Sequence, residues 1–364
     1  MGKKTPALLI VLLSAGLSCA STGGPPRASE GLRYKGMSYA SWWSGLYSSG
    51  ESSVSLHHLA RTGADWISLV VTGYQDHVRS TSIYRNEGTP SDDDLIQAMN
   101  QARRLGLKVM LKPHVDLWND PDHWRGQIGD EFTTEAEWQD WFAAYDEFID
   151  HYAELAEAQG AEMFCAGVEL EGTSHRAAEW RTALDGIRQR FHGPVIYAAN
   201  WGGEEDDLSW WDAVDIIGID AYYPLAQSPQ PTVDQLKAAW IPHRDALAGL
   251  ASRWQKPIVF TEIGYRSISG TASHPWDWQT QGQIDLREQA DAYQAVMETF
   301  DGLSWFAGIF WWYWGTDPTA GGSDDDDYTP FRKPAERILR KWYKARIPGF
   351  PRLNPPSKSR VPGS

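Results

Sequence analysis

Two glutamates stand at the ends of apolar runs that have the character of buried β-strands. Glu169 closes the segment M-F-C-A-G-V-E, and Glu262 closes the segment P-I-V-F-T-E. Burial of a carboxylate costs free energy unless hydrogen bonds or cations compensate, so each glutamate needs an explanation. One such glutamate alone is explained better by an ion pair or a helix cap than by catalysis. Two of them in one cleft would suit hydrolysis of a glycosidic bond, which uses one carboxyl group as acid and another as base or nucleophile.

The segments that would position the two glutamates alternate between short apolar runs and amphipathic stretches of helical period. The expected strands are Tyr34–Ala40, Trp66–Thr72, Lys108–Pro113, Met163–Val168, Val195–Ala199, Asp215–Asp220, Ile258–Thr261 and Ala307–Trp312. The expected helices are a segment capped by Ser91, then Glu135–Gln159, His175–Phe191, Val233–Arg253, Arg287–Thr299, Lys333–Ala345 and a short piece at Asp206–Trp211. Eight strands alternating with helices predict an α/β fold, a single (β/α)8 barrel domain over residues 32–346. A doubly wound sheet is the alternative, but the loop after the first strand lacks the Gly-rich turn typical of that fold.

In a (β/α)8 barrel the chemistry is carried by the loops at the carboxyl ends of the strands. Glu169 and Glu262 follow the fourth and seventh expected strands, which would lie nearly across the barrel mouth from each other. The other strand ends carry hydrogen-bonding and aromatic side chains and few cations. This composition favours a neutral, polyhydroxylated ligand, whose apolar faces stack on aromatic rings, over an anionic ligand.

Side chains at these strand ends are the candidates for ligand binding. His114, Asp116 and Asn200 are expected to bond sugar hydroxyls, although His114 could also be a strand-end histidine satisfied by a neighbouring carboxylate. Tyr222 is expected to hydrogen-bond Glu262 and hold it in place. The ring of Trp312 is expected to form the floor of the subsite where cleavage occurs. Further tryptophans are candidates either for outer subsites or for plain packing: Trp42, Trp43, Trp118, Trp124 and Trp201.

Several segments together resemble one known family, glycoside hydrolase family 113. They are K-G-M-S-Y at 35–39, L-K-P-H-V-D at 111–116, D-A-Y-Y-P at 220–224, F-T-E-I-G-Y at 260–265 and D-Y-T-P-F-R-K-P-A at 327–335. That family consists mainly of β-mannanases within a large clan of retaining (β/α)8 glycosidases. The resemblance implies that Glu169 is the acid/base and Glu262 the nucleophile. One position departs from the clan pattern, because Val168 stands where many members carry an asparagine that holds the sugar's 2-hydroxyl, and Asn200 is the candidate replacement.

We therefore expect an enzyme that hydrolyses β-1,4-mannan or manno-oligosaccharides with retention of configuration. The same mechanism on another β-linked glycan, such as a β-glucan, is the alternative among enzymes. A surface lipoprotein that binds carbohydrate without turnover is the alternative outside enzymes. The sequence implies no cofactor and no metal, because H-E-x-x-H, C-x-x-C and P-loop patterns do not occur in it. The acidic run Asp324–Asp327 lacks the spacing of a calcium loop and is interpreted as a solvated loop.

The N-terminal segment of the chain indicates export. Two lysines precede an apolar stretch within residues 1–20, a pattern typical of a signal peptide. Cys19 closes a stretch that resembles a bacterial lipobox, so we expect a cell-envelope lipoprotein, with ordinary secretion as the alternative. Residues 21–31 are predicted to be a flexible linker and residues 347–364 a Pro-rich tail. The net charge of −15 argues against nucleic acid as a partner, and membrane contact is expected only through the N-terminal lipid.

Overall fold

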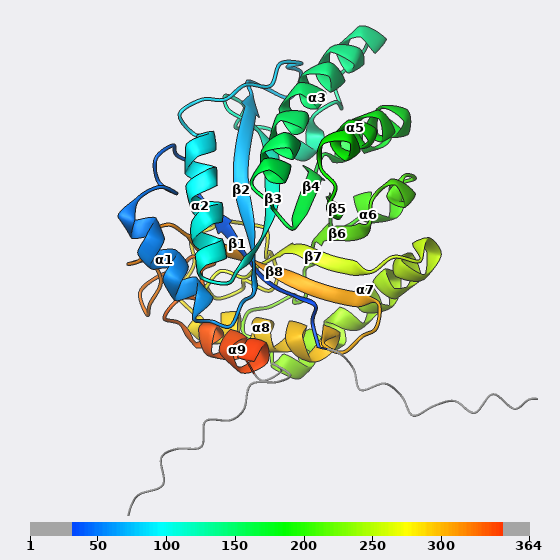
Figure 1. Cartoon of the computed structure of the whole chain (residues 1–364). Helices are drawn as coiled ribbons and strands as arrows, with labels where there is room; N and C mark the ends of the chain where they lie inside the picture. Colours follow the sequence, from blue (N-terminus) through cyan, green and yellow to red (C-terminus); the bar gives the residue numbers. More distant parts are fainter. Residues whose placement is uncertain (1–30, 345–364) are drawn as a thin grey trace, which may run out of the picture.

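The computed structural model describes residues 31–344 as a closed barrel of eight parallel strands, which follow one another around the barrel in sequence order. The helices surround the strands on the outside (Figure 1). This arrangement confirms the predicted (β/α)8 fold. The predicted signal peptide and Pro-rich tail, and the predicted linker apart from Gly31, lie outside the described residues. None of the helices within residues 31–344 is long and apolar enough to cross a membrane.

All eight strands lie where the sequence predicts them, and several run further toward the barrel mouth. They are β1 (Tyr34–Ala40), β2 (Trp66–Gln75), β3 (Lys108–Leu117), β4 (Met163–Val168), β5 (Val195–Asn200), β6 (Ile216–Asp220), β7 (Ile258–Ile263) and β8 (Phe306–Gly315). The ladder between β2 and β3 continues without a break to the pair Gln75 and Leu117, so it includes polar residues that we expected in loops. Rigid backbone therefore underlies the rim on this side of the barrel.

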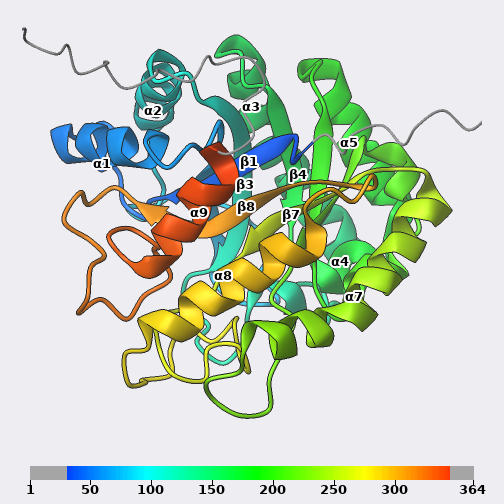
Figure 2. The same cartoon turned by 90° about the horizontal axis from the view of Figure 1, so that it is seen from below.

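Several of the longer helices begin where a capping side chain satisfies one of the first free backbone amides. Ser91 forms the predicted cap of α2, and Thr134 caps α3 in the same way. The helices are α1 (Gly50–Ala60), α2 (Asp92–Arg104), α3 (Glu135–Ala158), α4 (Glu171–Ser174), α5 (Ala177–Arg190), α6 (Glu204–Asp207), α7 (Val233–Trp254), α8 (Leu286–Phe300) and α9 (Pro334–Lys344), with short 3-10 turns η1 (Arg125–Gln127) and η2 (Trp211–Ala213). α1 was not among the predicted helices, although Ser49 caps it. α7, α8 and α9 lie side by side along one side of the barrel (Figure 2).

Apolar side chains form two separate layers, because successive strand residues point to opposite faces of the sheet. The layer inside the barrel includes Met110, Met163, Ile196, Val259 and Phe310. The larger layer between strands and helices holds many of the chain's twenty tryptophans in fully buried positions: Trp141, Trp180, Trp210, Trp211, Trp240 and Trp311. Much of the tryptophan excess therefore serves the core, and only part of it remains for a ligand.

A break in the strand register turns Glu262 toward the barrel mouth. Val259 belongs to the inner layer and Phe260 to the outer layer, so strict alternation along β7 would turn Glu262 toward the surrounding helices. The pairing of β7 with β8 shifts register between Phe260 and Ile263, and the pairing with β6 shifts at Asp220, opposite Glu262. Irregularities of this kind re-aim side chains and are frequent beside active sites.

Glu169 is aimed by a similar irregularity at the end of β4. The pairing of β4 with β5 shifts register between Cys165 and Val168, directly before the glutamate. The backbone of Glu169 has φ +51°, in the left-handed region that costs a residue with a Cβ about 1–2 kcal/mol. A hydrogen bond from its amide to the carbonyl of Ala198, 2.8 Å long, holds this conformation. Backbone strain of this kind gathers at functional sites.

Candidate active site

Glu262 is 4% exposed and is held at the barrel mouth by two hydrogen-bond donors. The Nζ of Lys112 lies 2.6 Å from its Oε1. The hydroxyl of Tyr222 donates to its Oε2 at 2.9 Å, which is the contact that the sequence predicts. An ionised carboxylate only accepts hydrogen bonds, and each oxygen of Glu262 has one donor here.

Lys112 is fully buried inside the barrel and joins three strands through its ammonium group. Besides Glu262 on β7, it donates to both carboxylate oxygens of Asp220 on β6 at 3.2 Å. The hydroxyl of Thr261 donates to the same Asp220 at 2.6 Å. Burial favours the neutral amine, but the charges of Asp220 and Glu262 outweigh it and hold the pKa of Lys112 above its ordinary value. The site therefore contains a permanent positive charge directly beside Glu262.

Lys112 was not predicted as part of the site, because few cations were expected at the barrel mouth. A signal was present in the segment V-M-L-K-P-H-V-D, which contains β3 residues Met110, Lys112 and His114 at alternate positions. Met110 lies in the inner layer, so alternation places the other two on the same inner face. A lysine that points into a closed barrel needs carboxylate partners, and the carboxylates at the ends of β6 and β7 supply them.

His114 lies beside Glu262 and keeps a nitrogen free for a ligand. Its Nε2 is 3.8 Å from Oε1 of Glu262, too far for a hydrogen bond, and it has no hydrogen-bonding partner within residues 31–344. Burial, together with the charges of Lys112 and Arg125, lowers the pKa of His114 well below its usual value, so the imidazole is neutral. The ring stacks near Trp312, with centroids 6.5 Å apart. This placement favours ligand binding over a histidine satisfied by a carboxylate.

Glu169 pairs with an arginine that the sequence did not identify as part of the site. The guanidinium of Arg125, on η1, donates to Glu169 at 3.0 Å and to Asp116 at 2.8 Å. Asp116 thus lies at the rim as predicted, but in this structure its partner is Arg125. Arg125 is on η1 in the loop that follows β3, and nothing in the sequence around it indicates this contact. The expectation of a rim poor in cations is wrong at both Lys112 and Arg125.

The carboxyl group of Glu169 differs in its electrostatic setting from that of Glu262. Its side chain is largely buried, with 12% exposed. Burial raises the pKa of Glu169 to about 7; the Arg125 charge opposes this rise and the Glu262 charge adds to it. Near neutral pH, Glu169 therefore holds a proton in a substantial fraction of molecules. One barrel mouth thus presents a clamped carboxylate and a carboxyl group able to give and take a proton.

The aromatic residues of β8 divide between the mouth and the core. Trp312 lies near His114, and its ring meets Trp42 edge to face at 6.2 Å, so it can offer a ring face at the mouth. Trp311 is buried and stacks on Tyr293 at 3.7 Å, so it faces the helices. The choice of Trp312 among the β8 tryptophans therefore agrees with the geometry. Two further candidates also lie at the rim: Trp43, which is 54% exposed, and Trp201, which packs on Trp276 at 4.9 Å.

Asn200, at the end of β5, is held by hydrogen bonds to two glutamates other than Glu169 and Glu262. Its side-chain amide donates to Glu171 at 3.1 Å, and its backbone amide donates to Glu204 at 2.7 Å. The described contacts do not bring it to Glu262. Burial raises the pKa of Glu204 well above its usual value, and the hydroxyl of Tyr197 lies 2.6 Å away from that carboxyl group. Asn200 therefore belongs to the surroundings of Glu171 more than to those of Glu262.

The acidic run Asp324–Asp327 lies in a loop, as the sequence predicts, and Asp324 is exposed. Each of the next three aspartates has a partner: Lys333 lies 2.6 Å from Asp325, Arg266 lies 3.1 Å from Asp326, and the Tyr313 hydroxyl donates to Asp327 at 3.0 Å. These contacts attach the loop to the β7 and β8 sides of the barrel mouth. Within residues 31–344, no cluster of His, Cys, Asp and Glu side chains is suited to hold a metal ion.

Known proteins of one family are similar to this chain in sequence and in fold. The sequence model of Glycoside Hydrolase Family 113 matches residues 37–333. A solved complex of a family 113 β-1,4-mannanase is 31% identical, with a TM-score of 0.78 over 86% of this chain and 100% of that one. The family 113 β-mannanase AaManA from Alicyclobacillus acidocaldarius is 32% identical, with a TM-score of 0.77 over 86% of this chain and 97% of its own.

More distant structures share the barrel alone. The β-glucuronidase of Ruminococcus gnavus is 14% identical, with a TM-score of 0.56 over 86% of this chain and 50% of that one. The set of curated proteins contains no match to this chain.

Replacement of Lys112 by methionine should destabilise the protein, and more so at higher pH. Loss of one partner from a buried ion pair costs about 3–5 kcal/mol. Burial and the charge of Glu262 raise the pKa of Asp220 in the folded state, so stability falls as pH rises from the ordinary Asp range through that raised value. Without Lys112 no cation opposes this rise, and only the hydrogen bond from Thr261 still lowers the pKa of Asp220. Denaturant unfolding at pH 5 and pH 8 should therefore show the larger loss at pH 8.

The matched control is Lys237→Met on α7, which removes a surface pair with Glu298 at 2.7 Å. Its unfolding midpoint should stay close to that of the unmodified protein, because exposed ion pairs contribute little. A Lys112→Met protein as stable as this control, or one whose loss is the same at both pH values, would contradict the role assigned to the buried ammonium.

Proposed function

The chain belongs to glycoside hydrolase family 113, and we propose that it cleaves β-1,4-mannosidic linkages in mannan and manno-oligosaccharides by double displacement. The family match over residues 37–333 confirms the resemblance seen in the sequence, and with it glycoside hydrolase activity. The observation that carries the mechanism is the pair Glu169 and Glu262, two carboxyl groups in one barrel mouth with different hydrogen-bond partners. The preference for mannan is supported by the family 113 β-1,4-mannanases at 31–32% identity.

In the first step, the ionised Glu262 attacks the anomeric carbon and forms a covalent glycosyl ester. Lys112 and Tyr222 hold this carboxylate in position through its two oxygens. The bond between the anomeric carbon and the glycosidic oxygen breaks, and Glu169 gives its proton to the departing oxygen. The pKa of about 7 makes the protonated form of Glu169 available near neutral pH.

In the second step, Glu169 acts as a base. It takes a proton from a water molecule, whose oxygen attacks the anomeric carbon and releases Glu262 as a carboxylate. Each displacement inverts the anomeric carbon, so the product keeps the configuration of the substrate. Arg125, which already contacts Glu169, stabilises the glutamate during the interval in which it is ionised.

The sugar in the cleaved subsite would lie between Glu262, His114 and Trp312. The free Nε2 of neutral His114 is placed to bond a sugar hydroxyl close to the nucleophile, and Trp312 offers a ring face below it. We assign the 2-hydroxyl contact to His114 in place of Asn200, because the Asn200 amide is engaged by Glu171. Val168, in the position of the usual asparagine, is buried in the inner layer of the barrel.

The two alternatives make different demands on the site. A carbohydrate-binding lipoprotein without turnover would have no use for a buried carboxylate clamped by an ammonium, since that arrangement is costly to build. Another β-linked glycan, such as a β-glucan, would use the same carboxyl pair, and only the shape of the sugar subsites would differ. As for location, the N-terminal segment supports export to the bacterial cell envelope, either as a lipoprotein anchored at Cys19 or as a secreted enzyme.

Mannohexaose and cellohexaose distinguish these functions. We expect the purified protein to release reducing ends from mannohexaose with a kcat/KM at least about a hundredfold higher than from cellohexaose, a difference of about 2.7 kcal/mol. Chromatography of the products measures both rates. Faster hydrolysis of cellohexaose would favour a β-glucanase, and binding of either chain without any cleavage would favour the carbohydrate-binding lipoprotein.

The pH dependence of kcat/KM should follow the fraction of enzyme in which Glu169 is protonated. Because the first step needs this proton, kcat/KM should fall as pH rises above about 7, the pKa of Glu169. The charge of Arg125 lowers that pKa from the value that burial alone would give. Arg125→Met should therefore raise it and move the falling limb of the profile to higher pH.

The matched control for this profile is Arg79→Met, which removes a half-exposed arginine that pairs with Glu131 and Glu137 outside the catalytic pair. The falling limb of this control should coincide with that of the unmodified enzyme. A limb that moves to lower pH in Arg125→Met, or does not move, would show that Glu169 is not the titrating acid.

A further inference from the structure

The backbone at Glu169 is attached to β5 by two consecutive amides. The amide of Glu169 donates to the carbonyl of Ala198, and the next amide, that of Leu170, donates to the hydroxyl of Tyr197 at 3.2 Å. The first bond joins two backbones, so it does not depend on the identity of a side chain. The second bond depends on the tyrosine hydroxyl, and a single substitution can therefore remove it.

Glu169 needs such bonds because of its backbone conformation. Its φ of +51° lies in the left-handed region, where a residue with a Cβ is strained. A strained residue keeps this conformation only where the surrounding contacts determine it. The peptide between Glu169 and Leu170 sets the direction in which the glutamate leaves the backbone, so the bond to the Leu170 amide helps to aim the carboxyl group.

The ring of Tyr197 is held firmly on the outer face of β5. The residue is fully buried, and its ring meets Trp180 at 5.2 Å and Trp210 at 4.9 Å between centroids. A Cβ at position 167 on β4 would lie 2.7 Å from this ring, so Gly167 leaves the space that the ring occupies. This packing holds the hydroxyl in one place against the turn that carries Glu169.

Glu204, on α6, orients the hydroxyl of Tyr197. A backbone amide can only donate, so the Tyr197 oxygen accepts from Leu170 and its one hydrogen is left for another acceptor. Oε1 of Glu204 is that acceptor, at 2.6 Å. Glu204 is 1% exposed, and a carboxyl group kept at such a buried position costs free energy. This cost indicates a role for Glu204 beyond packing.

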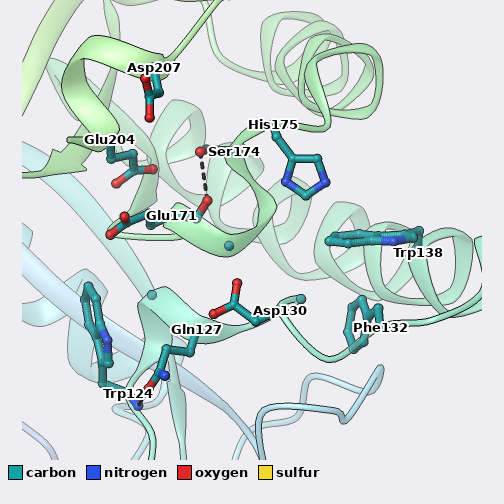
Figure 3. Close-up of a pocket in the computed structure, with 13 residues that line it drawn as sticks. Trp124, Gln127, Asp130, Phe132, Trp138, Glu171, Ser174, His175, Glu204 and Asp207 are labelled. Carbon is teal, nitrogen blue, oxygen red and sulfur yellow. Dashed lines mark hydrogen bonds between the residues drawn. The ribbon is translucent and has the colours of Figure 1, made fainter.

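The same glutamate is linked to the residue that follows Leu170. Figure 3 shows the carboxyl groups of Glu204 and Glu171 near each other, on α6 and α4. Asn200 connects the two, because its backbone amide donates to Glu204 at 2.7 Å and its side-chain amide donates to Glu171 at 3.1 Å. The end of β5 and α6 thus hold both residues that directly follow Glu169.

We propose that Tyr197 and Glu204 are positioning residues for the acid Glu169. The Tyr197 hydroxyl, oriented by Glu204, fixes the peptide that aims the Glu169 carboxyl group at the glycosidic oxygen. Neither residue takes part in a bond-breaking step, and both act through Glu169. The inference rests on the proposed function, since it presumes that Glu169 protonates the leaving oxygen.

Two substrates with the same sugars and different leaving groups test this role. Dinitrophenol is acidic enough to leave as an anion, whereas phenol needs a proton from Glu169. Tyr197→Phe keeps the ring and removes the hydroxyl. Its kcat/KM on phenyl β-mannobioside should fall about tenfold, as expected for the loss of one hydrogen bond that aims the acid. Its kcat/KM on 2,4-dinitrophenyl β-mannobioside should stay unchanged.

The matched control is Tyr223→Phe. Tyr223 is also a buried tyrosine, and its hydroxyl donates at 2.7 Å to Glu205, the neighbour of Glu204 on α6. This variant therefore loses a buried hydrogen bond to the same helix, and its ratio of the two kcat/KM values should equal that of the unmodified enzyme. An equal loss on both substrates in Tyr197→Phe, or no loss on either, would overturn the positioning role.

A second measurement repeats the substitution in Glu169→Ala. With the acid removed, no carboxyl group is left to aim, so added Tyr197→Phe should not lower kcat/KM on the phenyl substrate any further. A further loss as large as in the unmodified background would also overturn the positioning role. Failure of the proposed function has a different signature, because Glu169→Ala alone would then lose as much activity on the dinitrophenyl substrate as on the phenyl substrate.

Discussion

The interaction on which the site depends is the buried ammonium of Lys112 between Asp220 and Glu262. A charged lysine inside a barrel has lost its water, and this loss costs several kcal/mol unless carboxylates replace the solvent. Two carboxylates do so here, at 3.2 Å and 2.6 Å. β3, β6 and β7 must therefore meet in one register, since any slip along a strand would separate the three charges. The same contact that satisfies the lysine places Glu262 at the mouth.

Two glutamates of identical chemistry have different properties because their neighbours differ. Glu262 is held by an ammonium and a phenol, one on each carboxylate oxygen. Glu169 is held by one guanidinium, and its burial raises its pKa to about 7. Environments that separate the protonation of two carboxyl groups are the usual way in which a single fold supplies both a nucleophile and an acid near neutral pH. Here the difference follows from the donors around each carboxyl group and from the burial that raises the pKa of Glu169.

Strand periodicity was enough to predict the barrel. The strand-end residues named Glu169 and Glu262 as candidates, and their catalytic roles stay a prediction. Contacts across the barrel were harder to foresee. Lys112 was overlooked although alternation in β3 indicated its direction, because its partners come from strands far away in the sequence. Arg125 gave no signal, since its position depends on how a loop folds back over the mouth. The register shifts that aim the glutamates are equally invisible to a periodic pattern, because a bulge breaks the period itself. The ion pairs of Asp325 with Lys333 and of Asp326 with Arg266 were not predicted either, because they form only when separate segments fold together.

The central claim is that Glu262 and Glu169 have separate roles in a double displacement, and rescue by azide tests it most directly. Azide is added to Glu262→Ala and to Glu169→Ala, each with an activated aryl β-mannobioside, and NMR determines the configuration of the azide product. In the first variant azide replaces the missing carboxylate and inverts the anomeric carbon once, so the α-azide is expected. In the second it intercepts the ester on Glu262 after a first inversion, so the β-azide is expected. The same anomer from both variants, or a gain in rate in neither, would contradict the account.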